Sequence, residues 1–325
     1  ELGGLRWAQG DLDGARQHWV EVLALAEGLG DERMQALGAN GLGVVALCRG
    51  DAAEARRNLE RAVELCQQYG LAERLVIARI NLIELHHLTG NLRKAAELAD
   101  LTVAQAREAE HSFGLALGLR YRALVLVDLG RLAEARENAA EAVRMQRLLG
   151  NPEEELSARV MLVREALYAR DTVRAEVELE ACAPLLAEHD TEGMGPVLHA
   201  WRARLLHARG QPEPARRELD AARQAPGRQW PHQRIRFLLN LSRAAEELGD
   251  RDEAGSLAEE ALRLAEGCGY RLYVLKARRI AARATLDEAA AARHLRVAEA
   301  LARSLSANLV REEGEAMLSE QPGLG

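Results

Sequence analysis

One short string recurs seven times along the chain and constrains the fold more than any other feature. Its first residue is glycine in six of the seven copies, its second is polar, and alanine stands five positions after the first. The copies begin at Gly10, Gly50, Gly90, Gly130, Arg170, Gly210 and Gly249. The intervals between them are 40, 40, 40, 40, 40 and 39 residues, so the chain is built from units of nearly constant length.

The chemistry of this string predicts a helix end followed directly by a helix start. Glycine suits the left-handed conformation that terminates a helix. An Asp or Asn in the next position, such as Asp51, can accept hydrogen bonds from the free N–H groups that begin the next helix. The alanine allows two helices to approach closely. The alanines that follow in the last copy, Ala254, Ala258, Ala261 and Ala265, lie on one face of a helix.

A second, weaker turn separates the units. It is found at Gly28–Asp31, Tyr69–Leu71, Gly150–Pro152 and Gly267–Gly269. Each unit therefore consists of two antiparallel helices of about 15–18 residues, and the chain is all-α. An aromatic content of 3% argues against a β-sandwich or barrel. The length of 325 residues does not require several cores, because each unit of a repeat protein packs only on its neighbours.

The second unit resembles the tetratricopeptide repeat family. The matching signature residues are Leu42, Gly43, Gly50, Asp51, Glu54, Ala55, Leu59 and Ala62. Two features depart from the family: its helix-ending proline is absent, and the period is 40 residues instead of about 34. This long variant is similar to repeats in bacterial regulators and in the tails of bacterial Ser/Thr kinases. The resemblance implies a right-handed α-solenoid of seven to eight antiparallel helix hairpins.

We expect a single solenoid over residues 1–325. Its units are predicted at about 1–30, 31–70, 71–110, 111–150, 151–190, 191–229 and 230–269, with a partial unit at 270–309 and a tail at 310–325. Glu1 falls about four residues inside a unit, so we expect the N-terminus to be truncated within repeat one. The regularity weakens at His189–Pro196 and Gln224–His232. Trp230, in the second of these loops, is expected to be partly exposed and to cap the core of repeat six; the alternative is a binding or hinge role.

Composition and charge exclude several functional classes. A formal net charge of −7 argues against direct nucleic-acid binding, which requires a basic surface. There is no signal peptide and no apolar run near 18 residues, so we expect a cytoplasmic protein without a membrane segment. Cys48, Cys66, Cys182 and Cys268 stand far apart and are expected to be free thiols in a reducing compartment.

No motif of catalysis or cofactor binding is present. The chain contains no phosphate-binding loop, no dinucleotide-binding glycine motif, no H-E-x-x-H and no nucleophile elbow. His86 and His87 are adjacent, and their side chains would diverge by about 100° on a helix, which disfavours a shared metal. We therefore expect no enzymatic activity, no cofactor and no metal site.

The resemblance implies a concave groove lined by the first helix of each unit. The groove positions predicted for binding are Asn40, Glu84, His87, Arg120, Asp128, Arg164, Tyr168, Arg204, His207 and Arg243, with Val44, Val127 and Glu246 beside them. Arg164, Arg204 and Arg243 share one register and are expected to form a ladder that clamps carboxylates or a phosphate. The alternative is that these arginines pair with Asp or Glu inside the groove.

Two functional hypotheses follow. The first is a protein- or peptide-binding scaffold, the regulatory part of a larger bacterial signalling protein, which recognises an acidic segment in the concave groove. A covalently linked kinase or NTPase domain would be its output, and neither nucleic acid nor membrane would be a direct partner. The second is a small-ligand or short-peptide sensor that controls a linked kinase or transcription factor.

Overall fold

The computed structural model describes residues 11–189, 193–225, 230–306 and 309. Within these ranges the chain forms fifteen α-helices and no strand, which confirms the all-α class. The helices are α2 (Leu12–Leu29), α3 (Glu32–Arg49), α4 (Ala52–Gln68), α5 (Ala72–Leu88), α6 (Leu92–Glu108), α7 (Ser112–Asp128), α8 (Leu132–Leu149), α9 (Pro152–Tyr168), α10 (Thr172–His189), α11 (Gly195–Ala208), α12 (Pro212–Gln224), α13 (Pro231–Glu247), α14 (Arg251–Cys268), α15 (Arg271–Ala284) and α16 (Glu288–Ser306).

The recurring string forms the turn between paired helices. Gly50 ends α3 in the left-handed conformation, with φ of 80°, and its N–H donates to the carbonyl of Leu47. The side chain of Asp51 then accepts a hydrogen bond from the N–H of Glu54 at 2.8 Å and caps α4. Arg170, which replaces glycine in the fifth copy, also has a positive φ of 57°. The backbone geometry of the turn therefore persists where the residue type does not.

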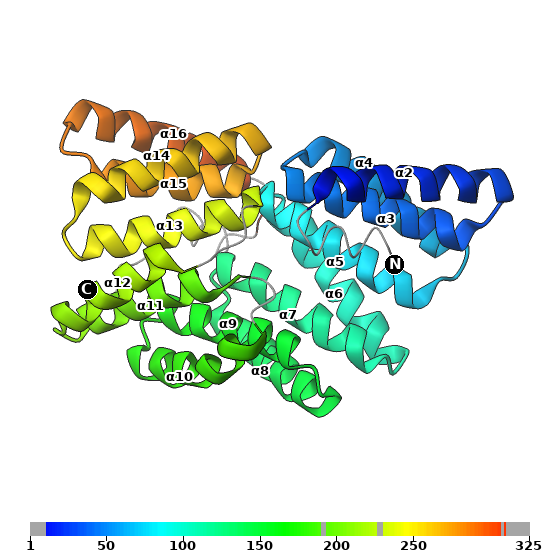
Figure 1. Ribbon diagram of the computed structural model, residues 1–325, viewed down its shortest axis with the longest axis horizontal. Helices are drawn as coiled ribbons and strands as arrows, with labels where there is room; N and C mark the ends of the chain where they lie inside the picture. The colour runs from blue at the N-terminus through cyan, green and yellow to red at the C-terminus, as the bar shows by residue number, and fades with distance from the viewer. Residues whose placement is uncertain (1–10, 190–192, 226–229, 307–308, 310–325) are drawn as a thin grey trace.

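Small residues allow the helices of each hairpin to pack closely. The string alanine is fully buried in every copy, from Ala15 and Ala55 to Ala254. A Cβ atom built on Gly43 would lie 2.6 Å from Cδ2 of Leu59, so α3 reaches α4 at a distance that only glycine permits. The hairpins α3–α4, α5–α6, α7–α8, α9–α10, α11–α12, α13–α14 and α15–α16 follow one another along the chain (Figure 1).

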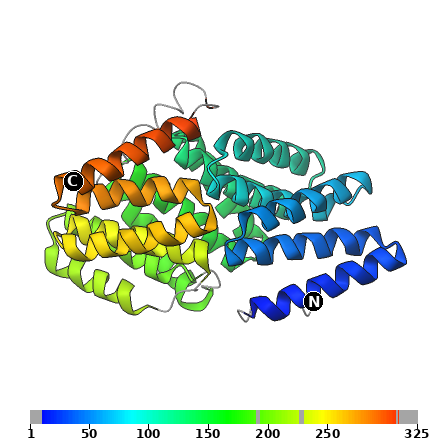
Figure 2. The same cartoon turned by 90° about the horizontal axis from the view of Figure 1, so that it is seen from above.

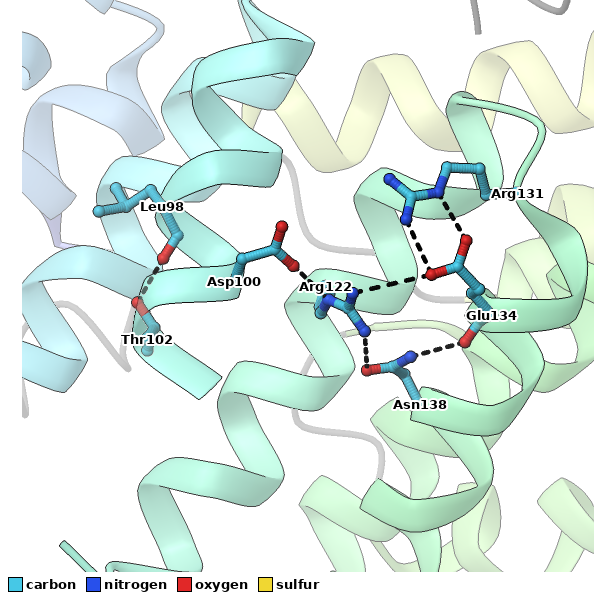
Figure 3. A network of polar contacts seen from close by, with 7 residues as sticks. All are labelled: Leu98, Asp100, Thr102, Arg122, Arg131, Glu134 and Asn138. Carbon is cyan, nitrogen blue, oxygen red and sulfur yellow. Dashed lines mark hydrogen bonds and ion pairs between the residues drawn. The ribbon is translucent and has the colours of Figure 1, made fainter. Parts of the chain in front are cut away.

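Polar side chains connect consecutive hairpins on the outer surface. Arg122 of α7 donates from Nε to Asp100 of α6 at 2.5 Å and from Nη1 to Asn138 of α8 at 3.0 Å (Figure 3). Nδ2 of Asn138 donates in turn to the backbone carbonyl of Glu134, whose carboxylate pairs with Arg131. This network joins three helices that are close in sequence, and it illustrates how neighbouring repeats are linked.

The superhelix closes on itself, which the periodicity did not predict. We call the contact of helices α3 to α7 with helices α13 to α16 the closing seam. The phenol of Tyr270 donates to the backbone carbonyl of Leu47 at 2.8 Å, across 223 residues of sequence. Leu47 and Leu59 share one hydrophobic cluster with Ile235 and Tyr270.

A second hydrophobic cluster extends the closing seam to the last helix. It joins Ile83 and Leu92 of the N-terminal hairpins to Leu272 and Leu305. Figure 1 shows the hairpins following a ring-like path on which the blue and orange ends meet, and in Figure 2 the orange-red helix α16 ends beside the teal helices, which include α6 and α7.

Parts of the predicted organisation lie outside the described residues. These are residues 1–10 at the start of repeat one, residues 190–192 and 226–229 in the two irregular loops, and residues 310–325 of the tail. None of the described helices combines the length and the apolar character needed to cross a membrane.

Candidate ligand-binding cavity

The first helices of the hairpins enclose an interior cavity of about 660 Å³, which we call the wide cavity. It is lined by residues of α2, α3, α5, α7, α9 and α13, from Trp19 and Asn40 to Arg236. A second space of about 100 Å³, the narrow cavity, shares Glu84, Met161 and Arg236 with it. The volume of the wide cavity lies within the range of small-ligand sites in proteins.

The walls of the wide cavity are largely apolar. The apolar side chains that line it are Trp19, Val44, Val45, Ile77, Leu124, Val160, Met161, Met194 and Trp230. Trp230 is only 8% exposed, so the expectation of a partly exposed Trp in this loop was wrong. Trp230 is the N-cap residue of α13 and faces the cavity, since the superhelix brings the start of α13 opposite α3.

One wall presents a pair of amides from consecutive hairpins. Nδ2 of Asn81 donates to Oδ1 of Asn40 at 2.9 Å. Within the described part of the chain, Nδ2 of Asn40 and Oδ1 of Asn81 make no other hydrogen bond, so one donor and one acceptor stay available to a ligand.

The wide cavity is also lined by charged side chains of α5, α7, α9 and α13. Arg120 pairs with Glu154, with 3.3 Å between Nε and Oε2, and its guanidinium stacks on Tyr121 at 4.3 Å from the ring centroid. The hydroxyl of Tyr121 donates to Glu84 at 3.4 Å. Nε2 of His232 lies 4.0 Å from Glu84. Burial, reinforced by the charge of Arg236, lowers the pKa of His232 to about 3, so this imidazole is neutral at pH 7.

Asp128 forms the most buried charged cluster. Its carboxylate lies 2.6 Å from Nε2 of His87, 2.7 Å from Nη2 of Arg164 and 2.8 Å from Nζ of Lys276. Burial alone would raise the pKa of Asp128, but the charges of Arg164 and Lys276 outweigh it and hold that pKa well below its usual range. Since burial also lowers the pKa of His87, a neutral imidazole donates to an ionised carboxylate.

The other two arginines of the predicted ladder also face a carboxylate. Arg204 makes a bidentate pair with Glu247, with distances of 2.8 and 2.9 Å. Nε of Arg243 donates to the same carboxylate at 3.4 Å. With Arg164 on Asp128, all three arginines are therefore ion-paired inside the groove. This arrangement corresponds to the alternative interpretation of the sequence and not to a ladder of open cations.

The predicted groove residues separate into three groups. Asn40, Glu84 and Arg120 line the wide cavity, and the residues that line the narrow cavity are Glu84, His87, Arg164, Tyr168, Arg204 and Arg243. Asp128 is buried behind the wall of the narrow cavity, where it contacts His87, Arg164 and Lys276. His207 lines neither cavity: it is exposed in the last turn of α11, a helix of only 14 residues.

Among the three accessory groove positions, Val44 lines the wide cavity as predicted. Val127 instead packs in a cluster with Leu126 and Ala135, towards the second helix of its own hairpin. Glu246 pairs with Arg283 of the following hairpin at 2.8 Å.

Sequence reasoning missed the polar residues at the start of α13. Arg236 lines both cavities, its Nε is buried without a hydrogen-bond partner, and no carboxylate pairs with it among the described residues. Oε1 of Gln233 is buried and unpartnered in the same way. Arg236 precedes Arg243 by seven residues, two turns of the same helix face, and that spacing was the signal that could have identified it.

The narrow cavity carries an excess of positive charge. Its cationic side chains are Arg164, Arg204, Arg236, Arg243 and Lys276, and the carboxylates that line or contact it are Glu84, Asp128 and Glu247. Burial, with the charge of Arg204, lowers the pKa of Arg243 to about 10, so this guanidinium stays charged at pH 7. Five positive groups against three negative groups favour an anionic ligand at this end of the interior.

No cluster of three or more His, Cys, Asp or Glu side chains suited to a metal ion occurs within the described ranges.

Comparison with known proteins agrees with the geometry. Tetratricopeptide repeat families match residues 1–68, 76–100, 196–221 and 235–268. The crystal structure of the apo form of RapI superimposes with a TM-score of 0.66 at 12% identity, covering 82% of this chain and 96% of that chain. This likeness shows a shared fold. The comparison with curated proteins gave no match.

Two further solved structures are more distant. Pseudomonas aeruginosa pilF has a TM-score of 0.46 at 22% identity and covers 75% of this chain and 98% of its own. BtubC from P. vanneervenii has a TM-score of 0.48 at 20% identity and covers 67% of this chain and 90% of its own.

Proposed function

Because this chain belongs to the tetratricopeptide repeat family, we propose that it binds a protein or peptide segment of acidic character in its concave interior. Repeats of this family serve as scaffolds for protein–protein interaction, in general without catalysis. The observation that carries the acidic preference is the excess of two positive charges around the narrow cavity.

The proposal includes a regulatory position in a larger bacterial signalling protein that acts in the cytoplasm, with a linked kinase or NTPase domain as the output. Four free cysteines, of which Cys48, Cys66 and Cys182 are buried, favour a reducing compartment. The sequence that flanks this chain in its gene product tests the regulatory part: a kinase or NTPase domain there supports it, and an unrelated structural domain contradicts it.

The closing seam favours a second candidate function. Contacts such as that of Tyr270 with Leu47 join the two ends of the superhelix and leave an interior cavity of limited volume. Such a space suits a short peptide or a small ligand better than a folded partner. The alternative is therefore a sensor whose ligand controls a linked kinase or transcription factor.

A library of synthetic twelve-residue peptides tests the binding role. We expect the retained peptides to be enriched in Asp and Glu. Asn40→Glu places a negative charge in the wide cavity and should weaken binding at least tenfold through like-charge repulsion. Gln67→Glu adds the same charge to the exposed surface of α4 and should leave binding unchanged. No retained peptide, or equal binding by both variants, would contradict the proposal.

A further inference from the structure

One cation that lines the wide cavity, Arg236, has no carboxylate partner among the described residues. We propose that this cavity binds a small apolar molecule ending in a carboxylate, and that Arg236 receives the carboxylate. This inference rests on the proposed function, because it takes the concave interior as the binding surface. It adds the class of ligand and the residue that anchors it.

Within the part of the chain that the structure describes, Arg236 differs from the other cations of the interior because it has no counter-ion. Arg164 and Lys276 share Asp128, and Arg204 makes a bidentate pair with Glu247. Nε of Arg236 is buried without a hydrogen-bond partner, and a buried polar atom without a partner is costly to the fold. A ligand carboxylate would remove that cost, since the guanidinium fork matches a carboxylate through two parallel hydrogen bonds.

The position of Arg236 places the carboxylate at the end of the ligand. Arg236 lies where the wide cavity of about 660 Å³ meets the narrow cavity of about 100 Å³. A chain that continued past this point would have to enter a space of only about 100 Å³, which is lined by the ion-paired side chains of Arg204 and Arg243. A ligand that ends in a carboxylate would stop where the two cavities meet and would not have to enter the narrow cavity.

The walls determine the rest of the ligand. Val44, Ile77, Leu124 and Val160 would contact an apolar body. Oε1 of Gln233, one turn before Arg236, would accept an N–H or O–H next to the carboxylate. The C-terminus of a short peptide has such a donor and a fatty acid lacks it, so the two sources of this chemistry can be separated.

Two ligand sets test the proposal on the full chain. The first is a mixture of tetrapeptides with free C-termini, compared with the same mixture as C-terminal amides by affinity selection and mass spectrometry. The second is decanoate, measured by isothermal titration calorimetry. We expect retention of free-acid peptides rich in apolar residues, and at least tenfold weaker retention of the amides. Binding of decanoate without peptide retention would identify a fatty acid as the source and still support the carboxylate site.

The matched variants are Arg236→Gln and Arg234→Gln. Arg234 lies on the same helix but pairs with Glu260 and lines neither cavity. Arg236→Gln should reduce the affinity for the free acids at least tenfold, and Arg234→Gln should leave it unchanged. Arg236→Lys keeps the charge without the fork and should bind with intermediate affinity. If Arg236→Gln fails to fold, the affinity of Arg236→Lys and the retention of the amide mixture test the proposal instead.

Three results would overturn the inference: equal retention of acids and amides, unchanged binding by Arg236→Gln, or no binding of either ligand set. The failure of the broader proposal is distinguishable. If the acidic twelve-residue peptides bind and Asn40→Glu abolishes that binding, while Arg236→Gln has no effect, the acidic-segment function stands and the Arg236 site does not exist.

Discussion

The contacts between neighbouring hairpins and the contacts at the closing seam stabilise the same superhelix in different ways. Neighbouring hairpins meet through small residues such as Ala62 of α4, which packs with Ala78 of α5, and through polar links such as Arg122 with Asp100. The closing seam uses residues that occur once, such as Tyr270 on Leu47 and Lys276 on Asp128. Loss of one neighbour contact removes one of many similar contacts, whereas the closing seam depends on a few specific residues.

Because of this difference, the stability of the helices and the shape of the interior depend on different contacts. Each hairpin already has a neighbour on which to pack, so local contacts can support the helices by themselves. The closing seam converts an open groove into a cavity. Variants at matched positions of the two kinds of contact therefore test the comparison directly.

The largest effect is expected at Asp128, which belongs to both kinds of contact. Asp128→Asn leaves Arg164 and Lys276 buried without their counter-charge, which should lower the free energy of unfolding by about 3–5 kcal/mol. Denaturant titration measures this value. The control is Glu97→Gln, whose pair with Arg93 is exposed and worth at most about 1 kcal/mol. Equal losses in both variants would show that the buried cluster has no special role.

A decrease in pH is expected to have an intermediate effect on the free energy of unfolding. Burial lowers the pKa of His232, in the interior beside the seam, to about 3 and that of His86, within a hairpin stack, to about 4. Between pH 6.5 and about 4, unfolded histidines bind protons that the folded protein excludes. Stability therefore falls with decreasing pH, by up to about 1.4 kcal/mol per pH unit for each histidine. Urea titrations across this window measure the slope.

Substitution of each histidine in turn distinguishes the contribution of the interior beside the closing seam from that of the neighbouring hairpins. His232→Gln and His86→Gln should each reduce the slope, because each removes one of the excluded protons. Only His232→Gln should also remove an acid-induced expansion in small-angle X-ray scattering, because a protonated His232 would be repelled by Arg236 in the interior. A slope that neither variant changes would exclude both residues as its source.

The smallest difference is expected between two glycines with the same backbone conformation. Gly50 and Gly150 end helices with φ of 80° and 70°, so alanine should cost about 1–2 kcal/mol at either position. A Cβ on Gly150 meets nothing within 4 Å, but one on Gly50 would collide with Sγ of Cys268 across the closing seam. Gly50→Ala should therefore cost about 1–3 kcal/mol more in thermal unfolding than Gly150→Ala.

A second substitution localises that difference. Cys268→Ala in the Gly50→Ala background should recover most of the additional cost, because it removes the colliding sulfur atom. Equal destabilisation by Gly50→Ala and Gly150→Ala would show that the contact with Cys268 at the closing seam does not constrain this turn.

Much of the candidate site was accessible to sequence reasoning, but its chemistry was not. The repeat register placed Asn40, Glu84 and Arg120 on the concave face, because positions on one helix face follow from the helical period, and the structure finds these residues in the lining of the wide cavity. The same register could not reveal the partners of the arginines. Lys276 reaches Asp128 across 148 residues, and Arg204 finds Glu247 in another hairpin, 43 residues away.

The sequence by itself determined the helices, their turns and their pairing, since these depend on glycine, capping residues and alanine within one 40-residue unit. Only the tertiary structure decided that the superhelix closes and that Arg236 has no counter-ion among the described residues. The physical reason is that small rotations between hairpins accumulate along the chain. The contacts at the end of that path therefore depend on all the hairpins together and have no signature in any one of them.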